Sequence, residues 1–117
     1  MNTKMAKGDK MKESTLQQIV RQYMSANGIF HFSIPNEHYN ISFKQRATLK
    51  KMGLVPGMPD LAILANGTIY FMQLKVEDDV LNKHQKIIIP RLIEKGYKVA
   101  IVYSYEQAVE QLKMWGV

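Results

Sequence analysis

The sequence predicts an α/β fold in which helices pack on a mixed central sheet. Segments with the helical period and segments with the strand period alternate in the order α, β, a variable segment, β, β, α, β, α. The dipeptide Asn66-Gly67, between two apolar segments, is a strong signal for a tight hairpin. A chain of 117 residues suits one domain with one core, which we place at 1–117.

The N-terminal elements follow from the spacing of apolar side chains. Residues 1–11 are expected to form a basic flexible arm, because lysine recurs through them. Residues 12–27 place apolar side chains at helical spacing, and residues 29–34 alternate apolar and polar side chains as a strand does. Residues 37–57 are less clear, although the piece FKQRATLKKMG favours a short basic helix.

The C-terminal elements follow a turn at Pro56-Gly57, after which Pro59 requires extended backbone. Pro90 lies inside the helix expected after the hairpin and predicts that this helix is kinked or divided. Ser104 with Gln107 predicts a capping box at the start of the last helix. The expected elements are strands at 61–64, 68–76 and 97–103 and helices at 81–95 and 104–115.

Three polar residues are expected to meet at the open end of the hairpin. With Asn66-Gly67 as a two-residue loop, Asp60 lies directly opposite Gln73, and Lys75 shares the face of Gln73. A polar cluster on an otherwise apolar strand is costly unless it is paired or used. A structural reading stays open beside the functional one: an Asp60–Lys75 ion pair at a sheet edge, with Gln73 bonded to a neighbour.

Glu13 is a third acidic candidate. It lies three residues before Leu16 and seven before Val20, so it borders the apolar stripe of the first helix. Together with Asp60 it could form a metal site. The simpler explanation is an acid favoured by the helix dipole, or a helix that begins after Glu13 with a Ser14–Gln17 capping box.

These residues lie in motifs that resemble a known family. The stretch PGMPDLAIL…IYFMQLK resembles the PD-(D/E)XK nuclease signature, in which Pro-Asp precedes a hairpin that ends in Asp/Glu-X-Lys. The pieces ESTLQQIV, GLVPGMPDL and VLNKHQKIIIPRLIEKGYKVAIVYS resemble VRR-NUC domains, and the resemblance extends from about Glu13 to Leu112. It implies a restriction-endonuclease-like core of the αβββαβ type and metal-dependent hydrolysis of phosphodiester bonds in DNA, with Mg²⁺ or Mn²⁺.

The resemblance also implies roles for single residues. Glu13 and Asp60 match acidic active-site positions, Lys75 matches the catalytic lysine, and Gln85 matches a glutamine on the helix after the hairpin. Gln73 departs from the family, which has an acid there, so the expected metal set is Glu13, Asp60 and Gln73 with reduced affinity. An engineered substitution and a natural chain with a weakened or lost site both explain Gln73. The intact motif elsewhere favours the first.

The charge balance predicts a polyanionic partner. Sixteen Lys and Arg residues against ten Asp and Glu residues give a net charge of +6, which favours nucleic acid. Any one of the basic side chains, taken alone, is more simply explained as a solvated surface charge. The three histidines lack metal-ligand spacing, so no zinc site is assigned. The candidate DNA-binding residues are Lys44, Arg46, Lys50, Lys51, Lys83 and Lys86.

Two functions stay open on these grounds. The first is a metal-dependent, structure-selective DNA endonuclease, similar to Holliday-junction resolvases and impaired by Gln73; the second is a non-catalytic DNA-binding protein on the same fold. A subunit of a larger nuclease assembly is a weaker third. Small relatives of this kind imply a homodimer and often a phage source, and the DNA partner would be branched or duplex. The absence of cysteine, of a signal-peptide pattern and of a long apolar run predicts a cytoplasmic protein, in the bacterial host cell if phage-encoded.

Overall fold

The computed structural model describes residues 11–35 and 42–117. The expected basic arm at 1–11 therefore lies almost entirely outside the described residues. No helix in the described part of the chain is long and apolar enough to cross a membrane. The elements are α1 (Glu13–Ala26), β1 (His31–Ser33), α2 (Phe43–Lys51), β2 (Leu61–Ala65), β3 (Thr68–Leu74), α3 (Lys83–Glu94), β4 (Lys98–Val102) and α4 (Tyr105–Trp115).

The sheet is mixed, as predicted. Its strand order is β1-β2-β3-β4, so strands that follow one another in the sequence also lie side by side. The β1–β2 and β2–β3 pairs are antiparallel, whereas β3 and β4 are parallel. The parallel pair requires a crossover, which α3 supplies.

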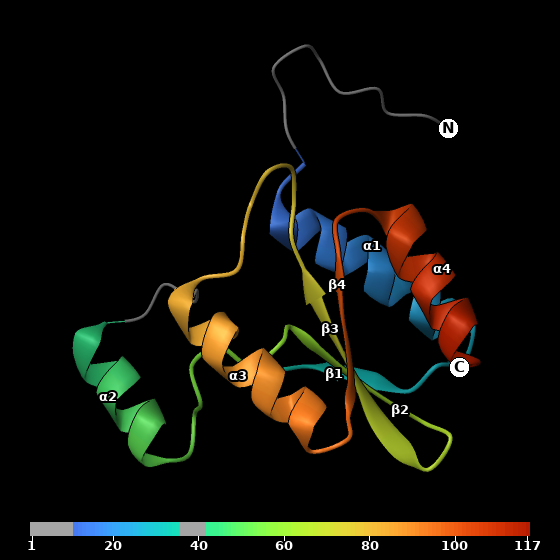
Figure 1. Ribbon diagram of the computed structural model, residues 1–117. Helices are drawn as coiled ribbons and strands as arrows, with labels where there is room; N and C mark the ends of the chain where they lie inside the picture. Colours follow the sequence, from blue (N-terminus) through green and yellow to red (C-terminus); the bar gives the residue numbers. More distant parts are fainter. Residues whose placement is uncertain (1–10, 36–41) are drawn as a thin grey trace.

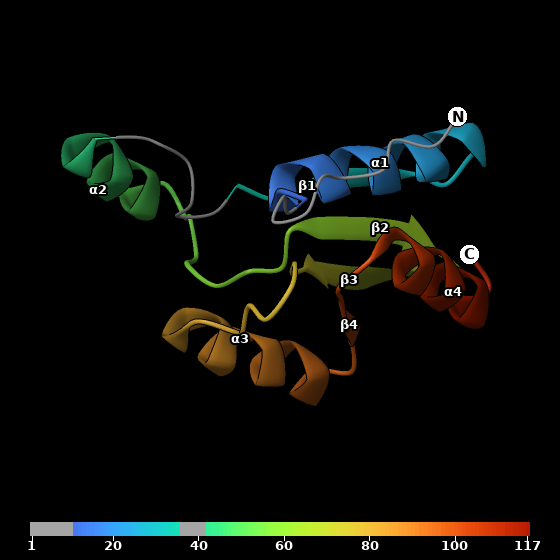
Figure 2. The same cartoon turned by 90° about the horizontal axis from the view of Figure 1, so that it is seen from above.

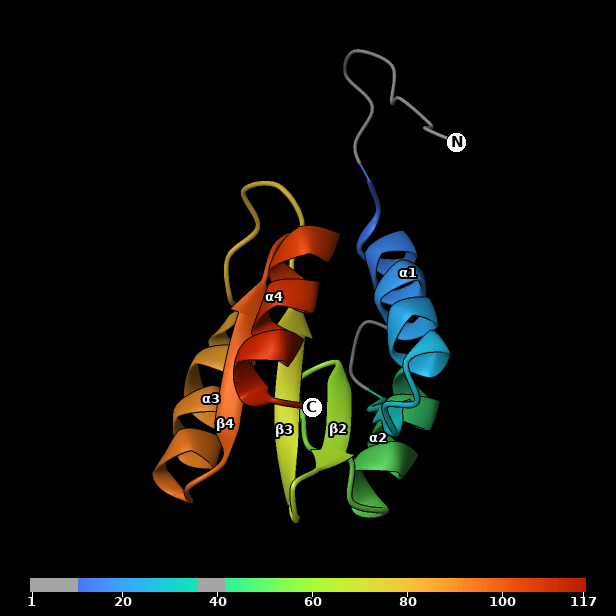
Figure 3. The same ribbon diagram turned by 90° about the vertical axis from the view of Figure 1, so that its right-hand side faces the viewer.

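Helices cover both faces of the sheet. Helices α1 and α4 lie on one side, and α2 and α3 lie on the other (Figures 1 and 2). Figure 3 looks at the sheet from the side of α1 and α4, with α2 and α3 behind it. The main core lies under α1 and α4, where Leu16, Val20 and Met24 of α1 pack against alternate residues of β2 and β3 and against Leu112 of α4.

The helix boundaries correct three details of the sequence prediction. Helix α1 begins at Glu13 with Lys12 as its N-cap, so a helix that starts after Glu13 with a Ser14 cap is wrong. Helix α3 runs through Pro90 without division. At α4 the Ser104 side chain accepts from the Gln107 N–H as expected, but the Gln107 side chain accepts from the Tyr103 N–H and not from that of Ser104.

Helix α2 confirms the short basic helix expected in the unclear segment. The Ser42 hydroxyl accepts from the Gln45 N–H at 3.1 Å, and the Gln45 side chain accepts from the Ser42 N–H at 3.0 Å. This reciprocal cap fixes the start of the helix. Unlike the other helices, α2 has no buried residue. It stands beside the body of the molecule (Figure 1).

Candidate active site

The hairpin places Asp60 and Gln73 against each other. Ala65 pairs with Thr68 and Leu61 with Met72, which is the register of a two-residue loop. Asn66 and Gly67 both have positive φ, at 54° and 73°, as a hairpin turn of this length requires. The Gln73 Nε2 atom donates to the Asp60 Oδ2 atom at 2.8 Å. The predicted cross-strand contact is therefore present.

Asp60 is held by β3 through two donors. Its Oδ2 atom accepts from the Leu74 backbone N–H at 2.9 Å as well as from Gln73. The Asp60 carbonyl accepts from the Ile34 N–H at 2.8 Å on the other side. The side chain is only 4% exposed. Both hydrogen bonds favour the ionised carboxylate and fix its orientation.

Gln73 is fully buried, and one of its two polar atoms is not satisfied. Its Nε2 atom donates to Asp60 and to the Leu74 carbonyl, at 2.8 and 3.2 Å. Its Oε1 atom is shielded from solvent and accepts no hydrogen bond. If the amide were reversed, Oε1 of Gln73 would face Oδ2 of Asp60. The hydrogen bond to Asp60 therefore fixes which of the two amide atoms is Nε2 and which is Oε1. A buried carbonyl oxygen without a donor destabilises the fold by about 1–3 kcal/mol.

Lys75 lies at the same strand end, immediately after β3. It is buried, and its backbone N–H donates to the Val102 carbonyl at 3.0 Å, which continues the parallel pairing with β4. By strand alternation its side chain lies on the face of Gln73. The sheet thus brings Asp60, Gln73 and Lys75 together. The hydrogen bond between Gln73 and Asp60 agrees equally with the structural reading, in which Gln73 bonds a neighbour.

Glu13 lies at the same end of the sheet. It is the first residue of α1, and this end of α1 stands near the end of β3 in Figures 1 and 3. Its side chain is half-buried, and its Oε2 atom is shielded from solvent. The place of Glu13 in a metal site with Asp60 stays a prediction.

Gln85 is buried on the first turn of α3. It is 2% exposed, so a solvated surface position is excluded. Its side-chain oxygen accepts from the Asn82 N–H at 2.9 Å, while the Asn82 side chain accepts from the Gln85 N–H at 2.9 Å. This capping box gives the Gln85 side-chain oxygen a hydrogen-bond donor and fixes the start of α3.

The turn before Asp60 presses directly against that start. Gly57 has a φ of +93°, and a Cβ atom placed there would lie 2.5 Å from the carbonyl carbon and oxygen of His84. Only glycine permits this approach. The Pro-Asp segment and the first turn of α3 are therefore in close backbone contact. Asp60 and Gln85 follow this contact on two neighbouring segments.

Among the described residues, no group of three or more His, Cys, Asp or Glu side chains is placed to hold a metal ion. In the cross-strand pair at the hairpin end, Asp60 is acidic and Gln73 is neutral. His31 is engaged elsewhere, since its ring contacts the Ile29 carbonyl and the Arg21 side chain. His38 lies outside the described residues.

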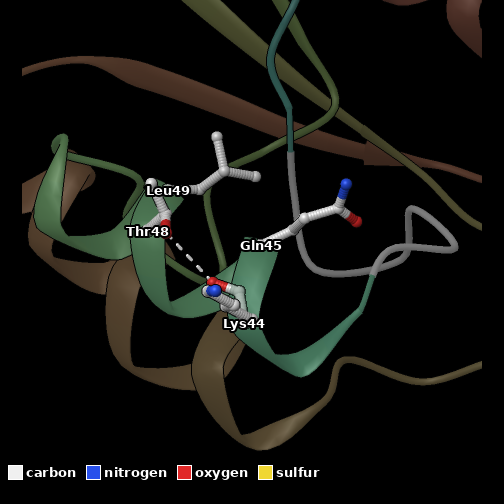
Figure 4. A pocket seen from close by; sticks show the side chains of 4 residues that line it. All are labelled: Lys44, Gln45, Thr48 and Leu49. Atoms are coloured by element: carbon white, nitrogen blue, oxygen red, sulfur yellow. Dashed lines mark hydrogen bonds between the residues drawn. The ribbon is translucent and has the colours of Figure 1, made fainter.

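The candidate DNA-binding residues lie on two helices on one side of the sheet (Figure 2). Lys44, Lys50 and Lys51 are exposed on α2, and Lys83 and Lys86 are exposed at the start of α3. Arg46 is half-buried, and its Nε atom is shielded from solvent without a hydrogen-bond partner. A cavity of about 390 Å³ lies along α2 and is lined by the four residues labelled in Figure 4. The Thr48 hydroxyl donates to the Lys44 carbonyl at 3.1 Å.

Solved structures include chains of similar fold, among them the following two. One, described as a VRR_NUC domain, has a TM-score of 0.62 and 23% identity, over 88% of this chain and 96% of that chain. The other, described as a VRR_NUC domain protein, has a TM-score of 0.72 and 19% identity, over 90% of this chain and 88% of that chain. This chain has the VRR-NUC fold. Neither the family models nor the curated proteins give a match to its sequence.

Within the VRR-NUC fold, two residues that position the site were missed in the sequence. Asn82 precedes Gln85 by three residues, which is the spacing of a capping box, so a signal was present. Gly57 was recognised only as part of a turn. Its contact with α3 joins segments 27 residues apart and has no local sequence signal.

Proposed function

We propose that this chain is a metal-dependent DNA endonuclease of the VRR-NUC type, in a form impaired by Gln73. The observation that carries the proposal is the buried Oε1 atom of Gln73, which accepts no hydrogen bond although the same side chain donates to Asp60. A buried carboxylate and a buried lysine flank an amide whose oxygen has no donor. Such a group of polar side chains at a strand end is more easily explained by a reaction than by stability.

The residues fit a divalent cation in part. The Gln73 Oε1 atom is a buried oxygen without a hydrogen-bond partner, as a ligand to a hard cation would be. Asp60 and Glu13 would supply carboxylate oxygens. Because residue 73 adds no charge, Mg²⁺ or Mn²⁺ would be held weakly. When bound, such a cation neutralises a phosphate oxygen and lowers the pKa of a water molecule.

The protein side chains have separate tasks in this proposal. Lys75 orients the attacking water and offsets the negative charge that grows on the phosphate. Asp60, fixed by Gln73 and Leu74, keeps its carboxylate aimed at the site. Gln85, fixed by Asn82, lies at the start of α3 and positions Lys75 or the water. The basic residues of α2 and α3 bind the DNA backbone.

The finer parts of the proposal come from the family resemblance. They are a preference for branched DNA, as in Holliday-junction resolvases, and a homodimer whose paired sites cut two symmetry-related strands. The net charge of +6 supports a nucleic-acid partner.

The deciding experiment restores the acid. Gln73→Glu changes the volume little, and we expect it to nick a four-way junction or a plain duplex in the presence of Mn²⁺ or Mg²⁺, whereas the unaltered chain cuts weakly or not at all. Cleavage is followed by gel electrophoresis of labelled DNA. Adding Lys75→Ala or Asp60→Asn to the restored protein should abolish cleavage again.

The binding-only alternative has its own outcome in the same assay. If Gln73→Glu folds, binds DNA and cuts no substrate with any divalent metal, the endonuclease proposal fails. The chain is then a non-catalytic DNA-binding protein, whose buried Asp60–Gln73 contact is structural.

A further inference from the structure

Helix α2 presents an aromatic ring on an outward face. Phe43, Ala47 and Lys50 are four and three residues apart, so they share one face of the helix. All three are exposed, and Phe43 is 85% exposed. We call these three residues the outward face of α2. A phenylalanine left so open to water at the start of a helix is not explained by the fold.

Leu49, on the opposite face of α2, is half-buried and turned toward the rest of the molecule. With Lys44, Gln45 and Thr48 it lines the cavity of about 390 Å³ along α2 (Figure 4). Leu49 also lines a second cavity of about 480 Å³ with Ile34, next to β1, and with Met58 of the Pro-Asp turn. The helix is thus oriented with Phe43 on the side away from Ile34 and Met58.

The charge of α2 selects the kind of partner. Its nine residues include four cations and no acid. A second copy of this face would bring like charges together, and an apolar partner would leave the lysines unpaired. A polyanion complements the surface. The cations are Lys44, Arg46, Lys50 and Lys51.

We infer that Phe43 stacks on an unpaired base of DNA, while Arg46 and Lys50 beside it contact the adjoining phosphates. An exposed ring flanked by cations is the arrangement that binds single-stranded nucleic acid, because every base has a face on which to stack. Bases within a duplex are already stacked, so Phe43 would favour DNA with a gap, flap or branch. This inference rests on the proposed function and gives it a residue that selects the DNA structure.

The test measures binding in EDTA, where cleavage cannot interfere. Fluorescence anisotropy compares a plain duplex with the same duplex containing a single-stranded gap that carries a fluorescent base analogue. Phe43→Ala should weaken binding to the gapped DNA by about tenfold and change duplex binding by less than about twofold. The fluorescence of the base analogue should be quenched by the unaltered chain and by Phe43→Trp, but not by Phe43→Ala.

Matched controls separate stacking from the loss of an apolar side chain. Met114 on α4 is 75% exposed and lies on the other side of the sheet, so Met114→Ala should leave both affinities unchanged. The inference is overturned if Phe43→Ala weakens both DNAs equally or neither. It is also overturned if that variant turns a dimer into a monomer in light scattering, because α2 is then a subunit contact. Failure of the unaltered chain to bind either DNA would overturn the proposed function as well, whereas normal binding with no effect of Phe43 overturns only this inference.

Discussion

Asp60 receives both of its β3 hydrogen bonds on one carboxylate oxygen, and Gln73 supplies one of them. The neutral amide therefore does part of what a cation would do, since it places a positive dipole beside a buried carboxylate. A glutamate at the same position would face Asp60 with a like charge. The amide makes this end of the hairpin stable without metal, and an acid would make its stability depend on metal.

This contrast predicts a stability difference that does not depend on cleavage. In EDTA, Gln73→Glu should lower the free energy of unfolding by about 1–3 kcal/mol, because a buried hydrogen bond becomes a like-charge contact. Mn²⁺ at about 100 times its dissociation constant should then stabilise that variant by about 2.7 kcal/mol. Thermal unfolding with and without Mn²⁺ measures both effects.

The unaltered chain and the double variant Gln73→Glu with Asp60→Asn serve as controls for this experiment. Both should gain less stability from the same concentration of Mn²⁺, because each has one carboxylate fewer than Gln73→Glu alone. An equal gain in all three proteins would show that the metal binds elsewhere.

The Pro-Asp turn and α3 behave as one unit because of Gly57. A methyl group at that position would meet backbone atoms of His84, which cannot rotate away as a side chain can. Gly96, at the other end of α3, has nearly the same φ, +94° against +93°, and open space around it. The two glycines therefore have almost the same φ, but only Gly57 is in close contact with the backbone of another segment.

Alanine at the two positions should separate strain from close contact. Gly96→Ala should lower the free energy of unfolding by about 1–2 kcal/mol, through the positive φ alone. Gly57→Ala should lower the free energy of unfolding by about 1–3 kcal/mol more than Gly96→Ala does, because the new methyl group overpacks against His84. Urea denaturation of both variants gives the comparison, and equal losses would contradict the close approach at His84.

The same turn marks the limit of prediction from sequence. The Asn66-Gly67 loop sets its register locally, so the contact between Asp60 and Gln73 followed from counting residues. Gly57 meets a helix that is distant in sequence, and no local pattern encodes that approach. Helix α3 also continues through Pro90, where local preference favours a break, so the predicted division was wrong.

Six Lys and Arg residues lie on α2 and the first turn of α3. Helix α2 and the first turn of α3 carry exposed lysines on the side of the sheet away from α1 and α4 (Figures 1 and 2). DNA binding on that side should be electrostatic and largely independent of sequence, because phosphates are alike in every sequence.

Salt dependence tests this distribution. On duplex DNA each phosphate contact contributes about 0.9 to the slope of log affinity against log salt, so Lys50→Ala with Lys51→Ala should reduce the slope by about 1.8. Lys113→Ala on α4 is the control and should leave it unchanged. Binding titrations over a range of salt concentrations supply the slopes. An affinity insensitive to salt, or a strong preference for one duplex sequence, would contradict the prediction.

The hairpin also has a consequence for the order of folding. Asp60 and Gln73 are only 13 residues apart, and a two-residue loop joins their strands, so little chain entropy is lost when they meet. Local pairs of this kind form early, before the crossover through α3 brings β4 alongside β3. We therefore expect the polar pair to be assembled on the hairpin before the rest of the fold encloses it. An exchange at position 73 should therefore change the rate of folding as well as the chemistry of the site.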